Sequence, residues 1–166
     1  MTKFLKPRLL LLLVFLACAG LIGFGLVLQN IEHLEPCPMC IMQRYAFALA
    51  GVIGLVGALH NPAGWGVRVY GALLALAALG GGSVAARQIW IQHYPPVVME
   101  CGPDLEYMVN SFPLGDALPM IFRGTGDCTK VLWRFLGLSI PEWSVLCFAG
   151  LLTVGLFLLL AKRRRV

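Results

Sequence analysis

The chain has 166 residues, of which 59% are hydrophobic and only 13% are charged, with a mean hydropathy of +0.82. A water-soluble domain of this length cannot bury so much apolar surface, so the composition favours a single membrane domain over residues 1–166. The net charge of +5 could indicate an anionic partner such as nucleic acid. The placement of the basic residues, described below, indicates membrane orientation instead.

Four apolar stretches are long enough to cross a bilayer. A helix rises about 1.5 Å per residue, so ~20 residues cover the ~30 Å hydrocarbon layer. Because lipid offers the backbone no hydrogen-bonding partners, each span should be an α-helix. The expected spans are about 9–28, 42–60, 69–86 and 143–161. We therefore predict an all-α membrane protein, a four-helix bundle whose first helix is an uncleaved span, since its apolar run exceeds the ~7–15 residues usual in a signal peptide.

Acidic and basic residues are segregated along the chain. All eight acidic residues lie in two predicted loops, about 29–41 and 87–142, whereas the two terminal tails and the remaining loop carry basic residues and no acids. Lys and Arg accumulate on the cytoplasmic side of membrane proteins. We expect both termini in the cytoplasm and the two acidic loops outside, in a bacterial periplasm. The basic tail 162–165 is then a cytoplasmic anchor, and no nucleic-acid partner is expected.

Four of the six cysteines fall in the two outer loops, which suits a compartment where disulfides persist. Cys37 and Cys40 form a Cys-Pro-Met-Cys motif where the second helix begins, and Cys101 and Cys128 both lie in the long loop. If the two pairs share one compartment, electrons can pass between them by thiol–disulfide exchange. The other two cysteines fall within spans, where a thiol behaves as a small apolar group, and we assign them no role.

The Cys-Pro-Met-Cys motif is compatible with a redox pair, half a zinc site or a static bridge. Its place in an exported loop, without histidine ligands at zinc-finger spacing, favours a redox pair and no bound metal. His33 precedes Cys37 by four residues and keeps a metal site open as an alternative. The positive partial charge of a helix N-terminus would stabilise a thiolate at this position.

Arg44 follows Cys40 by four residues, which places it on the same helix face, one turn deeper. A cation at that depth is costly, so it should face protein, a lipid headgroup or a polar ligand. A thiolate and a cation near the membrane surface would suit a quinone, whose ring oxygen gains negative charge on reduction. The alternative is that Arg44 extends to the lipid phosphates.

The long loop carries proline and glycine beside both of its cysteines, which is typical of exposed turns. The apolar segment 112–122 is too short to span, and we expect it to form a short helix on the membrane surface. A static disulfide between Cys101 and Cys128 would contribute ~2–4 kcal/mol by closing the loop. A static bridge alone does not account for a second cysteine pair on the same side.

These features resemble the DsbB family of bacterial inner-membrane thiol:quinone oxidoreductases. The resemblance covers essentially the whole chain. Besides the four spans, it rests on these motifs: residues 35–40 with Gln43 and Arg44, residues 92–95 before Cys101, residues 126–128, residues 133–138 and residues 141–143. It implies an enzyme that reoxidises a DsbA-like periplasmic oxidase of the thioredoxin fold. The two electrons would pass to ubiquinone or menaquinone in the membrane pool, which supports disulfide formation in exported proteins.

The resemblance also implies a role for each matching residue. The redox-active disulfides would be Cys37–Cys40 and Cys101–Cys128. Cys101 matches the cysteine that the reduced partner attacks, and Cys128 the one that is released and then attacks Cys37. Cys40 matches the thiolate in contact with the quinone, and Arg44 the arginine beside it.

One position departs from the pattern. Some family members carry a histidine near the outer end of the third helix that affects the quinone site, and here the matching position is Gln88, so we do not transfer the role. Two other interpretations remain open. One is a metal-handling membrane protein that uses Cys37 and Cys40, and the other is a non-catalytic scaffold with structural disulfides.

Overall fold

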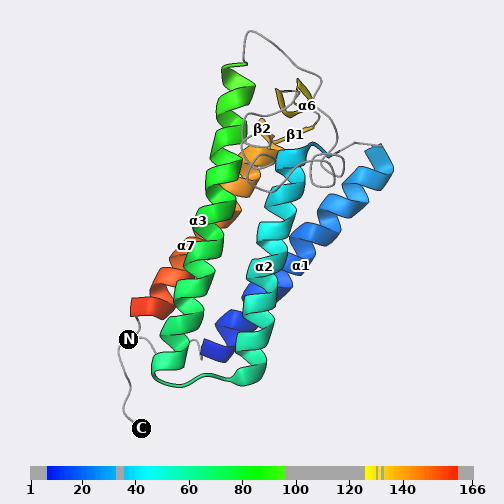
Figure 1. The fold of residues 1–166 in the computed structure, drawn as a ribbon. Coiled ribbons are helices and arrows are strands. Elements are labelled where there is room, and N and C mark those ends of the chain that lie inside the picture. Colours follow the sequence, from blue (N-terminus) through cyan, green and yellow to red (C-terminus); the bar gives the residue numbers. More distant parts are fainter. Residues whose placement is uncertain (1–6, 33–35, 96–125, 130, 132, 161–166) are drawn as a thin grey trace, which may run out of the picture.

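The computed structural model describes residues 7–32, 36–95, 126–129, 131 and 133–160. Within these residues, four helices are long and apolar enough to cross a membrane, which confirms the predicted four-helix architecture (Figure 1). They are α1 (Pro7–Glu32), α2 (Pro38–His60), α3 (Trp65–His93) and α7 (Ile140–Leu160). The four-residue helix α6 (Gly126–Thr129) and a hairpin of β1 (Arg134–Phe135) and β2 (Leu138–Ser139) lie at one end of this bundle.

The helices extend beyond the predicted spans. Helix α2 begins at Pro38, not near residue 42, and α3 continues to His93, not to residue 86. The predicted loops 29–41 and 87–142 were therefore too long at these ends. The predicted limits followed hydropathy, whereas backbone hydrogen bonding continues after the sequence becomes polar. The expected surface helix over 112–122 lies outside the described residues.

The start of α2 is fixed by its local sequence. Cys37 is the N-cap, with extended backbone angles (φ −66°, ψ 159°), and its sulfur accepts a hydrogen bond from the backbone N–H of Cys40 at 3.4 Å. Pro38 occupies the first helical position, where its missing N–H costs nothing and its fixed φ suits the helix. The helix therefore begins inside the Cys-Pro-Met-Cys motif.

The small hairpin corrects the all-α prediction. Arg134 pairs with Ser139 and Phe135 with Leu138 in an antiparallel ladder. Between them, Leu136 and Gly137 both have positive φ (53° and 84°), as the tight hairpin turns that match strand twist require. Strands of two residues are too short to show the alternation that identifies strands in a sequence.

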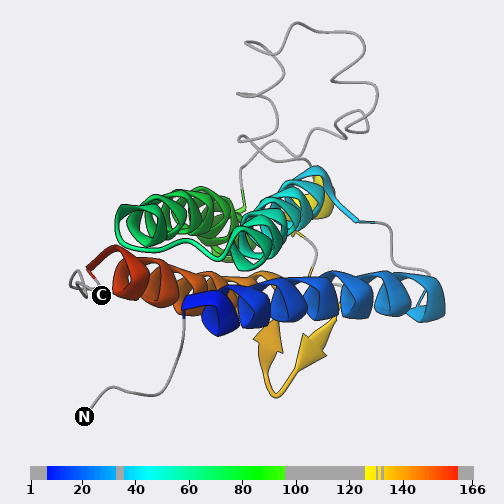
Figure 2. The ribbon, with the colours of Figure 1, turned by 90° about the horizontal axis from the view of Figure 1, so that it is seen from below.

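The long helices form two layers (Figure 2), with α2 and α3 in one and α1 and α7 in the other. Helix α3 packs closely on α7 and on α2, and α2 packs on α1, whereas α1 and α7 touch little. The α3–α7 crossing depends on Gly71 and Gly155, because a Cβ at either would lie 2.7–2.8 Å from the backbone of the other helix. Such close approach is how helices associate where lipid removes the hydrophobic driving force.

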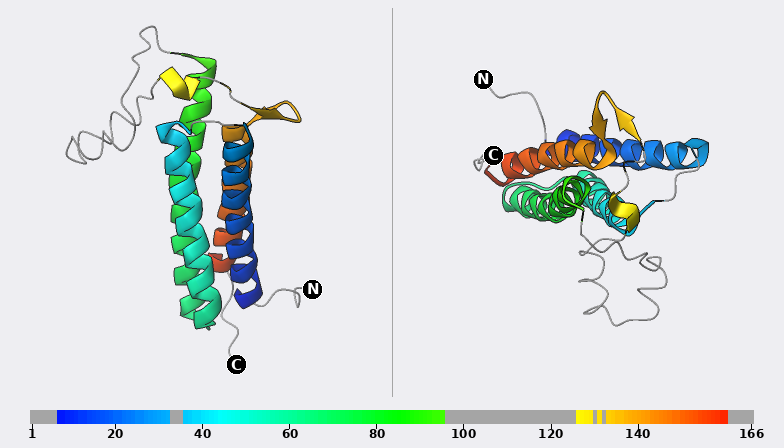
Figure 3. Two further views of the ribbon diagram at one scale, coloured as in Figure 1. Left: turned by 90° about the vertical axis from the view of Figure 1, so that its right-hand side faces the viewer. Right: turned by 90° about the horizontal axis from the view of Figure 1, so that it is seen from above.

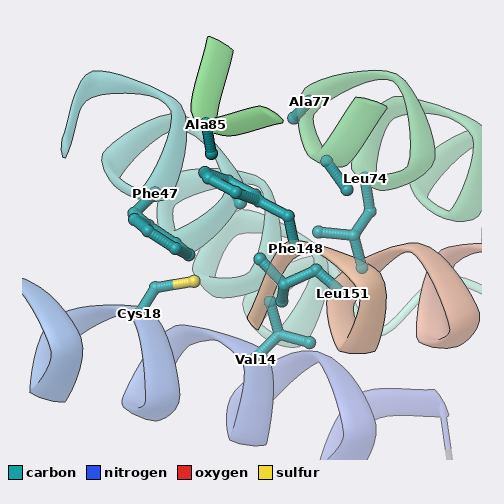
Figure 4. Packing of buried hydrophobic residues seen from close by; sticks show 10 residues of the cluster. Val14, Cys18, Phe47, Leu74, Ala77, Ala85, Phe148 and Leu151 are labelled. Carbon is teal, nitrogen blue, oxygen red and sulfur yellow. The ribbon is translucent and has the colours of Figure 1, made fainter. Parts of the chain in front are cut away.

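The largest buried cluster lies halfway along the bundle (Figure 4). Phe148 of α7 stacks on Phe47 of α2 with ring centroids 4.0 Å apart, and Gly81 of α3 leaves the space that the Phe148 ring occupies. Cys18 of α1 is fully buried here beside Val14. In contrast, large side chains such as Leu16 on α1 are exposed on the outer faces, as expected of helices solvated by lipid. The fold is that of a multi-pass membrane protein.

The two ends of the bundle differ. Helix α1 begins, α2 joins α3, and α7 ends at one end, while α6 and the hairpin lie at the other (Figure 1). Figure 3 shows α6 next to the α2–α3 layer and the hairpin projecting beyond the α1–α7 layer. Cys37, Cys40 and Cys128 are all at the end that carries α6.

Candidate redox site

Three of the four cysteines predicted to be redox-active lie in one cluster. Cys37 and Cys40 come from the start of α2, and Cys128 from α6, which packs on the last turns of α3. Met39, Val84 and Ile91 complete the buried part of the cluster. Cys128 is fully buried and Cys37 nearly so, whereas Cys40 is half-buried. The fourth predicted cysteine, Cys101, lies outside the described residues, as does His33.

The first turn of α2 brings Cys37 and Cys40 together. Both are free thiols, and their sulfur atoms are 2.9 Å apart. Because Cys37 caps the helix and Cys40 follows three residues later, both side chains lie on one face of the first turn. A disulfide bond is about 2.05 Å long, so the two sulfurs are placed to bond with little movement of the helix.

Cys37 and Cys128 pack in the same buried cluster. Hydrogen bonding with the Cys128 thiol raises the pKa of Cys37 most, followed by hydrogen bonding with Cys40 and by burial. A raised pKa means that Cys37 keeps its proton when the pair is reduced. Negative charge is therefore unfavourable on Cys37, whose sulfur lies between the two other sulfurs.

The polar side chain that contacts both sulfurs of the motif is Gln88 of α3. Its Nε2 lies 3.3 Å from the sulfur of Cys37 and 3.3 Å from that of Cys40. The Oε1 of Gln88 accepts a hydrogen bond of 2.7 Å from Nε2 of Gln43 on α2. Both glutamines are almost completely buried, with 2–3% of their surface exposed.

The predicted limits of the third span place Gln88 in the following loop, and the sequence assigns no role to Gln88 or to Gln43. A signal was present in the helical spacing. Gln88 follows the buried Val84 by four residues and precedes the buried Ile91 by three, and Gln43 lies four residues from the buried Met39. This spacing places each amide on the buried face of its helix.

Arg44 points away from the glutamines, toward α1. Its guanidinium donates to Oε1 of Gln29 at 2.7 Å and to the carbonyl of Gly25 at 3.4 Å. Facing protein is one of the three environments expected for a cation at this depth. Among the described residues the hydrogen bonds of Arg44 all go to α1, so the side chain next to the Cys40 sulfur is Gln88 and not Arg44.

Among the described residues, no group of three or more His, Cys, Asp or Glu side chains has the arrangement of a metal site. The side-chain donor that contacts these thiols is the Gln88 amide, which suits an anionic sulfur or an oxygen acceptor. The cluster is therefore best described as a thiol site with an amide donor beside it.

Fold and site together define a class: a membrane protein of four spanning helices that gathers thiols from two separate segments at one end. The family model described as "Disulfide bond formation protein DsbB" matches residues 7–158. Relatives named "Disulfide bond formation protein B" are 63% identical in Azoarcus sp. (strain BH72), 57% in Aromatoleum aromaticum and 48% in Hahella chejuensis, each over 95–96% of both chains.

The chain belongs to the DsbB family, which confirms the resemblance found in the sequence. The family name indicates a role in disulfide bond formation.

Proposed function

We propose that this protein reoxidises a DsbA-like periplasmic oxidase by thiol–disulfide exchange and passes the two electrons to a membrane quinone. The observation that supports this most is the cluster itself. Two cysteines at a helix start and a third from a segment almost 90 residues later in the sequence share one buried contact. A static bridge needs two sulfurs, whereas exchange between pairs needs a third within bonding reach of the first two.

The proposed exchange moves two electrons from the partner to Cys37 and Cys40. A partner thiolate attacks Cys101 of the Cys101–Cys128 disulfide, and Cys128 leaves as a thiolate. Cys128 attacks Cys37 of the Cys37–Cys40 disulfide, which forms a Cys37–Cys128 bond and releases Cys40 as a thiolate. The second partner thiol displaces Cys101, which in turn displaces Cys37 and restores the Cys101–Cys128 bond. The partner has then lost two electrons, and Cys37 and Cys40 hold them as thiols.

The contacts of the buried sulfurs support these assignments. Cys37 is the sulfur that Cys128 reaches, and its raised pKa makes it a poor site for negative charge. Cys40 is the more accessible of the pair and lies in the first turn of α2. The helix N-terminus favours negative charge there. Charge released by exchange therefore falls on Cys40, the sulfur that we propose faces the electron acceptor.

The residues around Cys40 fit a quinone by their chemistry. Quinone oxygens accept hydrogen bonds, and two donors lie on neighbouring turns: Gln88 contacts the Cys40 sulfur, and Arg44, one turn further along α2, donates to Gln29 of α1. We propose that Cys40 and Arg44 hold the ring, and that bound ubiquinone or menaquinone supplies the two-electron oxidation that returns Cys37 and Cys40 to a disulfide.

The location is part of the proposal. We place the protein in the bacterial inner membrane, with both termini cytoplasmic and the thiol cluster periplasmic. The segregation of charged residues supports this orientation. So does the bundle, in which the start of α1 and the end of α7 lie at the end away from the cysteines.

The test is oxidation of a reduced DsbA-like protein by the purified full-length protein with a soluble ubiquinone analogue. We expect multiple turnovers by the native chain and none by Cys40→Ser, because the acceptor-facing thiol is lost. Cys147→Ser is the matched control, since Cys147 lies within α7, away from the cluster. Turnover by Cys40→Ser at the native rate, or quinone-independent oxidation, would contradict the proposal.

A further inference from the structure

The two buried glutamines form a pair that links α2 to α3 next to the thiols. Gln43 and Gln88 are 45 residues apart in the sequence, and their amides are joined by one 2.7 Å hydrogen bond. Burying an amide without a hydrogen-bond partner costs free energy, and this cost is greater where lipid surrounds the helices. Each amide is therefore a constraint on the other as well as a link between the helices.

The direction of this hydrogen bond determines what the sulfurs meet. An amide has one acceptor end and one donor end. Because Nε2 of Gln43 donates to Oε1 of Gln88, the acceptor end of Gln88 is occupied and its NH2 group is directed toward Cys37 and Cys40. The Cys40 sulfur lies nearer to this Nε2, at 3.3 Å, than to Oε1, at 3.8 Å. In the opposite orientation the sulfurs would meet a carbonyl oxygen, which repels a thiolate.

We infer that Gln43 is a positioning residue for the redox pair: it orients the Gln88 amide so that a donor is presented to both sulfurs of the Cys-Pro-Met-Cys motif. This inference rests on the proposed exchange function, in which the released negative charge falls on Cys40. A donor at 3.3 Å from the Cys40 sulfur can stabilise that charge without rearrangement.

The Gln43–Gln88 hydrogen bond is also insensitive to pH, because an amide does not titrate. Among the described residues, the titratable groups in this cluster are the thiols of Cys37, Cys40 and Cys128, while Arg44 is hydrogen-bonded to α1. The donor that Gln88 offers therefore stays the same over the whole pH range in which the thiols change charge.

The test measures thiol reactivity directly. The reduced, purified full-length protein is pulsed with iodoacetamide between pH 5 and 9, and labelling of each cysteine is quantified by mass spectrometry. In Gln88→Met the donor is absent, and we expect labelling of Cys40 at pH 7 to fall about tenfold, the effect of one hydrogen bond to a charged group. Gln43→Glu should give a similar loss although Gln88 is intact, because a carboxylate only accepts and will draw the Gln88 NH2 group toward itself.

A double variant separates orientation from charge. The carboxylate of Gln43→Glu repels a thiolate by itself, but that repulsion persists when Gln88 is replaced. If Gln43 acts through Gln88, most of the effect of Gln43→Glu disappears in the Gln88→Met background. Gln43→Met gives an uncharged version of the same cycle if the glutamate variant does not fold. Gln92→Met is the matched control, because this glutamine of α3 contacts Ser139 and not a sulfur.

The inference is overturned if Gln88→Met leaves labelling unchanged, or if Gln43→Glu has the same effect with and without Gln88. These results are independent of the proposed function. A protein that labels as expected but does not oxidise its partner would refute the function, whereas turnover with unaltered labelling in the variants would refute only the role of the glutamine pair.

Discussion

Two regions of the buried face of α2 differ in the residues that line them. In the middle of the bundle, Phe47 of α2 meets Phe148 of α7 in an apolar cluster closed by small residues. One turn earlier on α2 the buried residue is Gln43, and three residues after the buried Ala85 of α3 it is Gln88. The face remains buried, but its chemistry changes from packing to hydrogen bonding. Polar groups are tolerated at this depth because they are paired with each other.

The largest effect should come from removing the link between the two cysteine segments. In Cys128→Ala, exchange between the pairs is impossible, and we expect turnover with the partner to be essentially abolished. The same change removes the main cause of the raised pKa of Cys37, so this pKa should fall and alkylation of reduced Cys37 should begin at lower pH. Coupled turnover assays and pH-dependent labelling measure the two effects.

Cys147→Ala is the control for this variant. If Cys128→Ala keeps native turnover, the thiol cluster is not the route for electrons. The difference between the two regions would then have no connection with electron transfer.

The next largest effect is a loss of stability when the apolar region is altered. Phe148→Ala should lower the free energy of unfolding by about 3 kcal/mol, because it empties the space that Gly81 leaves for the ring. Reversible unfolding in mixed micelles measures this loss. Phe157→Ala on the same helix is the matched control, since that ring is 57% exposed to lipid. We expect iodoacetamide labelling of the thiols to be unchanged in Phe148→Ala, and a large change there would mean that the two regions are not independent.

The smallest effect lies at the start of α7. Ser139 directly precedes α7, and Oε2 of Glu142 accepts hydrogen bonds from its backbone N–H at 2.6 Å and from its hydroxyl at 2.8 Å. Ser139→Ala should cost about 1 kcal/mol of unfolding free energy, because the hydrogen bond from the hydroxyl to the carboxylate is lost. Ser144→Ala, in which the hydroxyl only bonds back to the Ile140 carbonyl, should be close to neutral. Equal losses in both variants would show that the hydrogen bond from Ser139 to Glu142 contributes nothing.

The sequence was sufficient to predict the four helices, because a long apolar run in lipid is expected to be an α-helix. It was also sufficient to place two sulfurs at one helix start, since the spacing of Cys37 and Cys40 determines that locally. Helix ends were missed because polar residues such as Gln88 lower the hydropathy although the helix continues. The redox roles of the four cysteines and of Arg44 stay predictions.

Local sequence patterns could not predict contacts between distant segments of the chain. Nothing in the residues around Gln43 specifies that its partner is Gln88, because the pairing depends on how α2 and α3 pack. Likewise, the spacing placed Arg44 near Cys40, but the direction of its side chain depends on Gln29 of α1. The hairpin at Leu136 was missed because its strands have only two residues each.

The positions of the outer helix ends have a practical consequence for anyone who modifies this protein. Because α1 begins and α7 ends at the end of the bundle away from α6 (Figure 1), a fluorescent reporter or purification handle joined before α1 or after α7 starts at the opposite end from the thiol cluster. Such fusions leave the space around the cluster free. Handles inserted after α6 or in the hairpin would compete for that space.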